Sequence, residues 1–176
     1  MPTKSSLCFA LTLMLGATCL AQTTNAVSTN AASAWTTDIA AARALSKSAH
    51  KPIYVFITDG SKDCEKVQKS LLESGLFQRF AKDNFVLLRL DVPNVPKKEI
   101  PKHIDTLLAK VAHKYPGMIL LDAKEKCIAK VTYQAPRKIS DYLFDLKDIL
   151  EKKDYSVDAS ALEGLSPPKL PTPTKK

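Results

Sequence analysis

Hydrophobic and polar positions alternate along residues 35–152 in two distinct patterns. Short apolar runs, rich in β-branched residues and closed by turn residues, predict buried strands. We expect four strands, at Ile53–Ile57, Phe85–Leu90, Met118–Leu121 and Cys127–Tyr133. Apolar residues spaced three and four apart predict helices. We expect one from Thr36 or Thr37 to just before Lys51, one from Lys62 with a break near Gly75, one through Ile104–Val111, and one whose first residue is Pro136.

The order of these elements predicts how the strands pair. A long helical stretch joins the first two strands, which implies a right-handed parallel crossover. Only the turn 123–126 separates the last two strands, which implies an antiparallel hairpin. The sequence therefore predicts an α/β domain with a mixed sheet.

One stretch combines a buried strand with reactive chemistry. The first strand ends at the turn Thr58-Asp59-Gly60, and Ser61 follows as a candidate N-cap. Cys64 then lies in the first turn of the next helix. Because the unpaired N–H groups and the dipole at a helix N-terminus favour a thiolate, Cys64 is a candidate for thiol chemistry.

This arrangement resembles the thioredoxin superfamily, in particular secreted thioredoxin-like domains. The resemblance covers roughly residues 35–150 and rests on these features: Trp35, Lys51-Pro52, the strand Ile53–Ile57, Cys64, Leu90-Asp91, and Tyr115-Pro116 before Met118–Leu121. It implies a thioredoxin-like three-layer sandwich, with helices on both faces of the sheet. It also implies that Pro116 is the cis-proline that faces the motif and presents backbone to an extended substrate.

The chain departs from the family at the redox motif. Where the family has Cys-x-x-Cys, this chain has Ser61-Lys62-Asp63-Cys64. Thiol–disulfide exchange needs an attacking thiolate and a second thiol to resolve the mixed disulfide, and a serine hydroxyl cannot replace the first. The resemblance therefore implies a degenerate dithiol site.

Three functions remain open for such a chain. The first is binding of a protein or peptide partner, which could contain a thiol, at the surface around Ser61–Cys64 and Pro116. That surface includes Lys62, Asp63, Tyr115 and Gly117. The second is a single-cysteine thiol–disulfide oxidoreductase that acts through Cys64, the only catalytic candidate. The third is a purely structural accessory domain whose tails do the binding. For Cys64 itself, the alternative to a reactive thiol is a small, semi-buried core residue.

The two ends of the chain differ in amino-acid composition from its centre. Residues 1–21 carry Lys4, an apolar run and small residues, the pattern of a secretory signal peptide. We therefore expect a secreted or periplasmic protein without a membrane-spanning segment, with lipid attachment at Cys19 as an alternative. Residues 22–34 are expected to form a flexible leader, and residues 153–176 a flexible, proline-rich tail.

Composition excludes several other classes of function. The formal charge is +8, but the lysines are scattered rather than concentrated in a stripe, which argues against nucleic-acid binding. The three histidines, at positions 50, 103 and 113, show no metal-ligand spacing, and we expect neither metal nor cofactor. Cys64 and Cys127 belong at opposite ends of the predicted sheet, too far apart for a disulfide.

Overall fold

The computed structural model describes residues 35–92, 102–111, 114–134 and 136–167. The expected signal peptide with Cys19, the leader 22–34 and His113 lie outside these residues. Within them, no helix combines the length and apolar character needed to cross a membrane.

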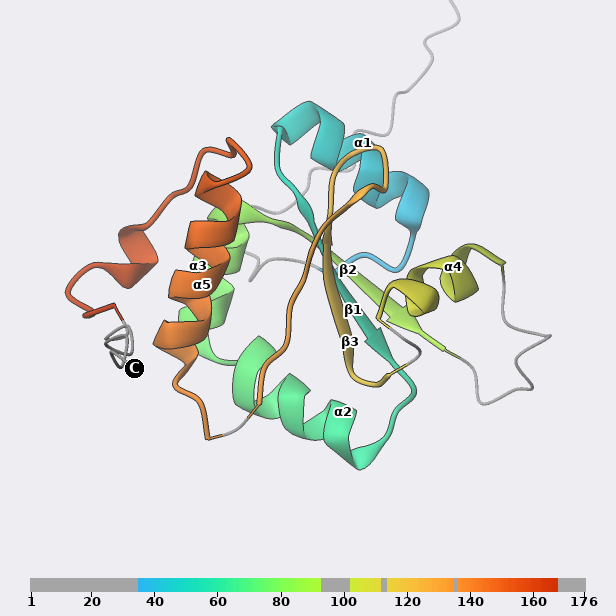
Figure 1. Cartoon of the computed structure of the whole chain (residues 1–176), viewed down its shortest axis with the longest axis horizontal. Coiled ribbons are helices and arrows are strands. Elements are labelled where there is room, and N and C mark those ends of the chain that lie inside the picture. Colours follow the sequence, from blue (N-terminus) through green and yellow to red (C-terminus); the bar gives the residue numbers. More distant parts are fainter. Residues whose placement is uncertain (1–34, 93–101, 112–113, 135, 168–176) are drawn as a thin grey trace, which may run out of the picture.

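Four strands form a single mixed sheet. They are β1 (Ile53–Thr58), β2 (Val86–Asp91), β3 (Gly117–Leu121) and β4 (Cys127–Lys130). Their order in the sheet is β2-β1-β3-β4, with β1 parallel to β2 and antiparallel to β3, and with β3 antiparallel to β4 (Figure 1). The predicted parallel crossover and the predicted hairpin are therefore both confirmed.

Six helical segments longer than one turn accompany the sheet in the described part of the chain. They are α1 (Ile39–Ala49), α2 (Lys62–Val67), the π-helix η1 (Gln68–Leu72), α3 (Gly75–Asn84), α4 (Lys102–Lys110) and α5 (Ile139–Glu151). A short 3-10 helix, η3 (Ser160–Leu162), follows α5. The break predicted near Gly75 is confirmed, because Ser74 caps α3 there by accepting a hydrogen bond from the Phe77 N–H at 3.2 Å.

The alternation of side chains along β1 builds two cores, one on each face of the sheet. Ile53, Val55 and Ile57 face the layer that contains α1 and α4. Tyr54 and Phe56 face the layer that contains α2, α3 and α5. Because β1 lies inside the sheet, all six of its residues are buried, as its unbroken apolar run predicted. The α/β three-layer sandwich is confirmed.

Three predicted boundaries were wrong. Helix α1 begins at Ile39 rather than at Thr36 or Thr37, because Asp38 caps it by accepting a hydrogen bond from the Ala40 N–H at 2.8 Å. Pro136 does not begin α5, because it lies in a turn in which the Arg137 N–H donates to the Gln134 carbonyl at 3.0 Å. Strand β4 ends at Lys130 rather than Tyr133. Its partner β3 begins at Gly117, and the preceding Pro116 has no N–H with which to extend the ladder.

Residues 154–167, which follow α5, pack against the domain, whereas we expected a flexible tail over residues 153–176; residues 168–176 lie outside the described part. Buried Asn84 on α3 holds this segment through its side-chain amide, which donates to the Asp158 carbonyl and accepts from the Asp158 N–H, both at 2.8 Å. Leu162 packs into the core at 5% exposure, and Tyr155, Val157 and Ala161 pack against it. These apolar residues are scattered among polar ones and show no periodic pattern from which the contacts could be predicted.

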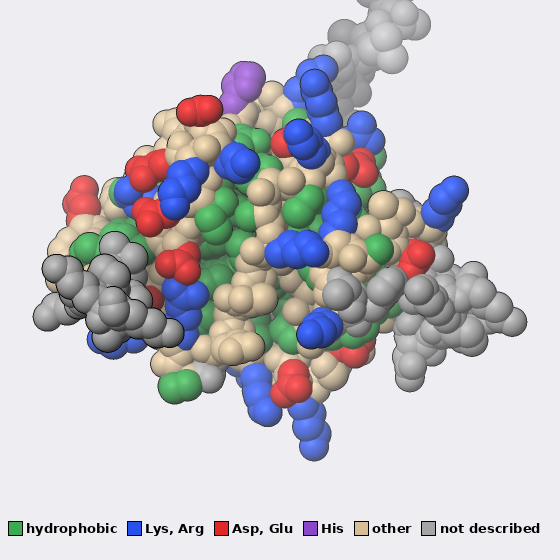
Figure 2. All heavy atoms as spheres, viewed as in Figure 1, with side chains coloured by type: hydrophobic (Ala, Val, Ile, Leu, Met, Phe, Trp, Pro, Cys, Tyr) green, Lys and Arg blue, Asp and Glu red, His purple; other side chains and the backbone are tan. Residues whose placement is uncertain are grey.

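The exposed surface carries charges of both signs. Figure 2 shows lysine and arginine side chains distributed over the whole visible face, with acidic side chains between them. This distribution agrees with the scattered lysines of the sequence.

Candidate functional site

The turn after β1 delivers Cys64 to the start of α2. Gly60 adopts a φ of 75°, a left-handed conformation that favours glycine, and its N–H donates to the Thr58 hydroxyl at 3.1 Å. Ser61 then caps α2, as predicted, and its hydroxyl accepts from the Cys64 N–H at 3.5 Å. The chain thus turns sharply and places residues 61 and 64 at the first turn of the helix.

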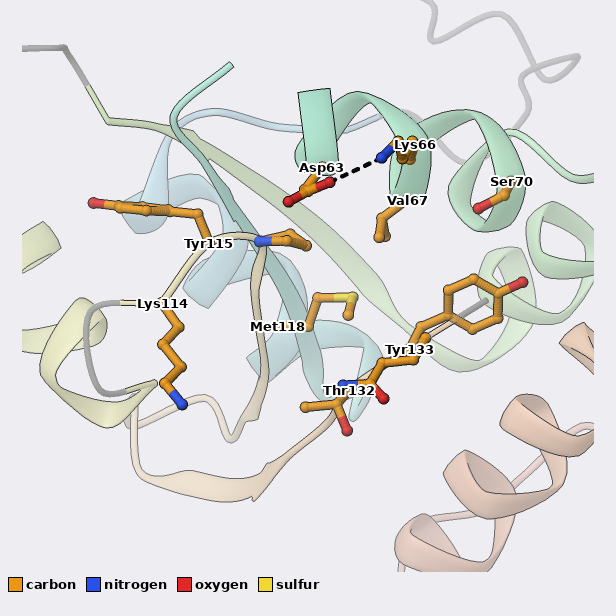
Figure 3. A pocket seen from close by; sticks show the side chains of 11 residues that line it. Asp63, Lys66, Val67, Ser70, Lys114, Tyr115, Met118, Thr132 and Tyr133 are labelled. Atoms are coloured by element: carbon orange, nitrogen blue, oxygen red, sulfur yellow. Dashed lines mark hydrogen bonds and ion pairs between the residues drawn. The ribbon is translucent and has the colours of Figure 1, made fainter. Parts of the chain in front are cut away.

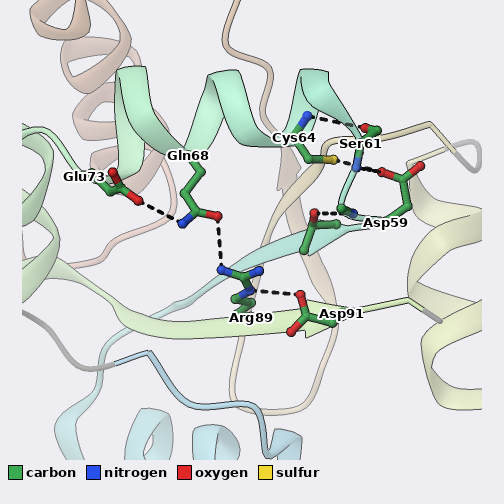
Figure 4. A network of polar contacts seen from close by, with 9 residues as sticks. Asp59, Ser61, Cys64, Gln68, Glu73, Arg89 and Asp91 are labelled. Carbon is green, nitrogen blue, oxygen red and sulfur yellow. Dashed lines mark hydrogen bonds and ion pairs between the residues drawn. The ribbon is translucent and has the colours of Figure 1, made fainter. Parts of the chain in front are cut away.

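The Cys64 thiol is enclosed and hydrogen-bonded. Its side chain is 2% exposed, and its Sγ donates to Asp59 Oδ1 at 3.2 Å (Figure 4). The same oxygen accepts from the Ser61 N–H at 3.0 Å. Burial acts to raise the pKa of Asp59, but the hydrogen bonds from Ser61 and Cys64 outweigh it and hold that pKa below its usual value. Asp59 is therefore an ionised acceptor for both the Cys64 S–H and the Ser61 N–H.

Asp59 is a site residue that the sequence did not single out. It reads as an ordinary turn residue between Thr58 and Gly60. Asp91, the carboxylate that ends the neighbouring strand β2, pairs with Arg89 at 2.9 Å instead. The signal available for Asp59 was its place in the turn, two residues before Ser61.

Tyr115 and Pro116 approach this turn from the start of β3. The Tyr115–Pro116 peptide bond is cis, as the resemblance implied. Burial raises the pKa of Tyr115, and the charge of Asp59 raises it further. A Cβ at Gly117 would come within 2.9 Å of Val111, and the chain therefore needs glycine there.

A groove of about 590 Å³ opens beside Pro116, between α2 and the segment that follows β4. Figure 3 shows Val67 and Met118 facing each other across it. Val67, Met118 and Tyr133 are each at most 9% exposed and form an apolar floor. The rim is polar and includes Ser70, Lys114, Thr132, Gln134 and an ion pair of 3.1 Å between Asp63 and Lys66.

The groove contains some of the predicted site residues but not all of them. Asp63, Tyr115 and Pro116 line it, whereas Ser61, Lys62, Cys64 and Gly117 do not. Sequence analysis missed the apolar floor. Val67 could have been predicted as part of the floor, because it follows Asp63 by four residues and so lies on the same helix face. Tyr133 and Met118 meet only through the fold.

Two buried tyrosines support the groove floor from the core. Tyr54 Oη donates to Met118 Sδ at 3.1 Å and lies 2.8 Å from Tyr142 Oη. Burial raises the pKa of both phenols, so both stay neutral at physiological pH and serve as hydrogen-bonding groups. The floor residue Met118 is thereby fixed by a side chain of the central strand.

Cys64 and Cys127 are both free thiols. Cys64 packs in the core on the α2 side of the sheet, and half-buried Cys127 packs against the core on the α1 side. Their separation follows from the register, which places Cys127 opposite Leu121, at the end of β3 remote from Pro116. Across the described residues, no group of three or more His, Cys, Asp or Glu side chains is arranged to hold a metal ion.

Comparison with known proteins places this geometry in a family. Residues 34–123, just over half of the chain, match the family profile described as thioredoxin-like. The chain belongs to the thioredoxin-like family. A search of curated proteins found no match.

Solved structures share the thioredoxin-like architecture. A structure titled DsbH oxidoreductase is 27% identical, with a TM-score of 0.56, and the alignment covers 67% of this chain and 84% of that one. A thioredoxin from Thermus thermophilus is 15% identical, with a TM-score of 0.53, over 70% of this chain and 92% of that one. The second likeness concerns the fold alone, whereas the first relates this thioredoxin-like chain to an oxidoreductase.

Proposed function

We propose that this thioredoxin-like protein binds an extended segment of a partner polypeptide in the groove beside Pro116, without dithiol turnover. The observation that carries the proposal is the contrast between an open groove and a closed thiol. The groove has an apolar floor and a polar rim, the usual composition of a peptide-binding surface. Cys64, in contrast, is 2% exposed.

The motif itself supports binding rather than turnover. Ser61 stands three residues before Cys64, at the place where the family carries its attacking cysteine. Its hydroxyl is engaged as the cap of α2, and the carboxylate that it meets, Asp59, has a lowered pKa and is therefore a weak base for activating it. Without a first thiol, the two-step exchange that a dithiol performs has no starting nucleophile.

The groove has the chemistry to hold a peptide. Val67, Met118 and Tyr133 can bury an apolar side chain of the partner, since each is already part of the packed core and loses little entropy on binding. Thr132 and Gln134 on the rim are exposed polar residues beside that floor. An extended segment could therefore place one side chain on the floor and hydrogen-bond along the rim.

The test is chemical-shift mapping with an unfolded protein as the probe. Isotope-labelled wild-type protein is titrated with reduced, carboxymethylated α-lactalbumin, which has neither free thiols nor disulfides. We expect saturable shifts at Val67, Met118 and Tyr133. Shifts that are absent, or that lie only on the opposite face, would refute the proposal.

A matched pair of variants sharpens this test. Ser70→Tyr places a bulky side chain at the rim of the groove, whereas Ser48→Tyr makes the same change at an exposed position of α1. We expect Ser70→Tyr to lose the shifts and Ser48→Tyr to keep them. Equal binding by both variants would show that the groove is not the site.

The similarity to the DsbH oxidoreductase favours a second candidate, a single-thiol oxidoreductase. In that reaction the Cys64 thiolate would attack one sulfur of a partner disulfide and form a mixed disulfide. The second partner sulfur would leave as a thiolate and take up a proton, and a separate low-molecular-weight thiol would release Cys64. Trapping a disulfide-linked adduct on wild-type protein but not on Cys64→Ser would favour this candidate.

A further inference from the structure

The π-helix η1 brings together two polar side chains that an α-helix would hold apart. The Glu73 N–H donates to the Gln68 carbonyl at 2.9 Å, the five-residue bond of a π turn. Residues five apart on an α-helix point about 140° away from each other. Here the Gln68 amide donates to Glu73 Oε1 at 2.8 Å. Such wide turns occur frequently at functional sites.

A strand residue fixes this pair from the other side. Arg89 Nη1 on β2 donates to Gln68 Oε1 at 3.1 Å (Figure 4). Both the nitrogen and the oxygen of the Gln68 side-chain amide are therefore hydrogen-bonded. Arg89 also forms an ion pair with Asp91 at 2.9 Å. Its positive charge is therefore balanced by Asp91. Glu73 accepts only from a neutral amide, and none of the described cations pairs with it.

A pocket of about 370 Å³ lies at this network, on the side of the helix away from the groove. Its apolar wall comes from Trp35, Phe56 and Leu72, and its polar wall from Gln68, Glu73 and Arg89. Trp35 is half-buried and packs edge-on against Phe56, with ring centroids 6.3 Å apart. The pocket thus combines an aromatic wall with a carboxylate, Glu73, that no described cation contacts, while the Arg89 guanidinium in the same wall is paired with Asp91.

We propose that this pocket binds an organic cation, namely a primary ammonium or guanidinium group on an aliphatic stem. The stem packs against Trp35 and Leu72, and the charge lies at Glu73 within reach of the indole ring. An aromatic face and a carboxylate both attract a cation and both repel an anion. The bridging Gln68 holds the carboxylate in place before the ligand arrives, which lowers the entropic cost of binding.

A fluorescence titration can isolate this pocket, because Trp35 is the only tryptophan of the chain. The full-length protein is titrated with Nα-acetyl-lysine N-methylamide and, separately, with the neutral isostere Nα-acetyl-norleucine N-methylamide. We expect the lysine derivative to change the emission of Trp35 saturably and the isostere to have a much smaller effect. No saturable change, or equal binding of both probes, would overturn the proposal.

Variants test the assigned charge. Glu73→Gln keeps the size of the side chain and removes its charge, and we expect it to weaken binding of the lysine derivative about two- to fivefold. Glu163→Gln is the control, because it removes an exposed charge on a different surface. Unchanged affinity in Glu73→Gln would overturn the role of Glu73, and circular dichroism verifies that both variants fold.

Such a cation can be a small free amine or a basic side chain of a polypeptide, and a third probe distinguishes these two sources. If n-butylamine binds as tightly as the lysine derivative, the ligand is a small free amine. If the lysine derivative binds more tightly, the adjoining peptide groups contribute, and the ligand is a basic side chain of a polypeptide. The proposal is independent of the groove beside Pro116, because neither Trp35 nor Glu73 lines that groove.

Discussion

The motif turn and the groove lie on the same helix, α2, but differ in their access to a partner. At the motif turn, Cys64 is buried and donates to Asp59 at 3.2 Å. In the groove, Val67 lies one helical turn further along and contributes to an open apolar floor. The difference shows that this fold keeps a groove open beside a closed thiol. Under the proposed function, binding in the groove does not require the thiol.

The largest effect is expected from restoring a thiol at the motif turn. Ser61→Cys should give a dithiol three residues apart on one helix face, next to the unpaired N–H groups of the helix start. Wild-type protein should reduce insulin disulfides with dithiothreitol only at the background rate. The variant should exceed that rate clearly, as measured by insulin turbidity.

A control and a contradicting outcome accompany this variant. The double variant Ser61→Cys with Cys64→Ser should lose the gain, because it lacks the second thiol. If a well-folded Ser61→Cys protein keeps both thiols open to alkylation under mild oxidation, residue 61 does not occupy the attacking position.

A smaller effect is expected at the floor of the groove. Tyr54→Phe removes the hydroxyl that bonds both Met118 and Tyr142. The Tyr142 hydroxyl is then buried without this partner, and we expect the free energy of unfolding to fall by about 1–3 kcal/mol in urea denaturation. Adding Tyr142→Phe should cost less than the separate effects predict, because both changes remove the same bond. Additive losses would show that the bond is not formed.

The fold could be predicted more completely than the site. The unbroken apolar run of β1 and the helical spacing around it predicted an α/β domain with a mixed sheet, since burial on both faces leaves a local signature. The three-layer sandwich was implied by the family resemblance. The site depends on contacts between distant residues. Met118 and Tyr133 meet at the floor, and Tyr54 bonds Met118 across 64 positions of sequence. No local pattern carries such contacts.

The π turn could not be predicted from the sequence for a different reason. Gln68–Leu72 has an ordinary helical composition, and Leu71 and Leu72 are both buried. Nothing in that composition distinguishes a π turn from an α turn, so the wider turn was not predicted. Asp59 is similar, because its role depends on where the Cys64 sulfur comes to lie.

The smallest effect concerns the hydrogen bond that holds the thiol. Cys127 is half-buried and should react with iodoacetamide several times faster than Cys64, as followed by mass spectrometry. Asp59→Ala removes the acceptor of the Cys64 thiol and should raise the rate at Cys64 modestly while leaving the rate at Cys127 unchanged. Equal rates for both cysteines in the wild-type protein would mean that the motif turn is as open as the rest of the surface.

The most direct test of the account is to measure how tightly the protein binds a thiol-free polypeptide with and without Cys64. Reduced, carboxymethylated α-lactalbumin is titrated into wild-type protein, Cys64→Ser and Ser70→Tyr, and the dissociation constants are compared by calorimetry. The account predicts that Cys64→Ser binds like the wild type, since the thiol does not line the groove, and that Ser70→Tyr binds much more weakly. Loss of binding in Cys64→Ser together with unchanged binding in Ser70→Tyr would contradict it.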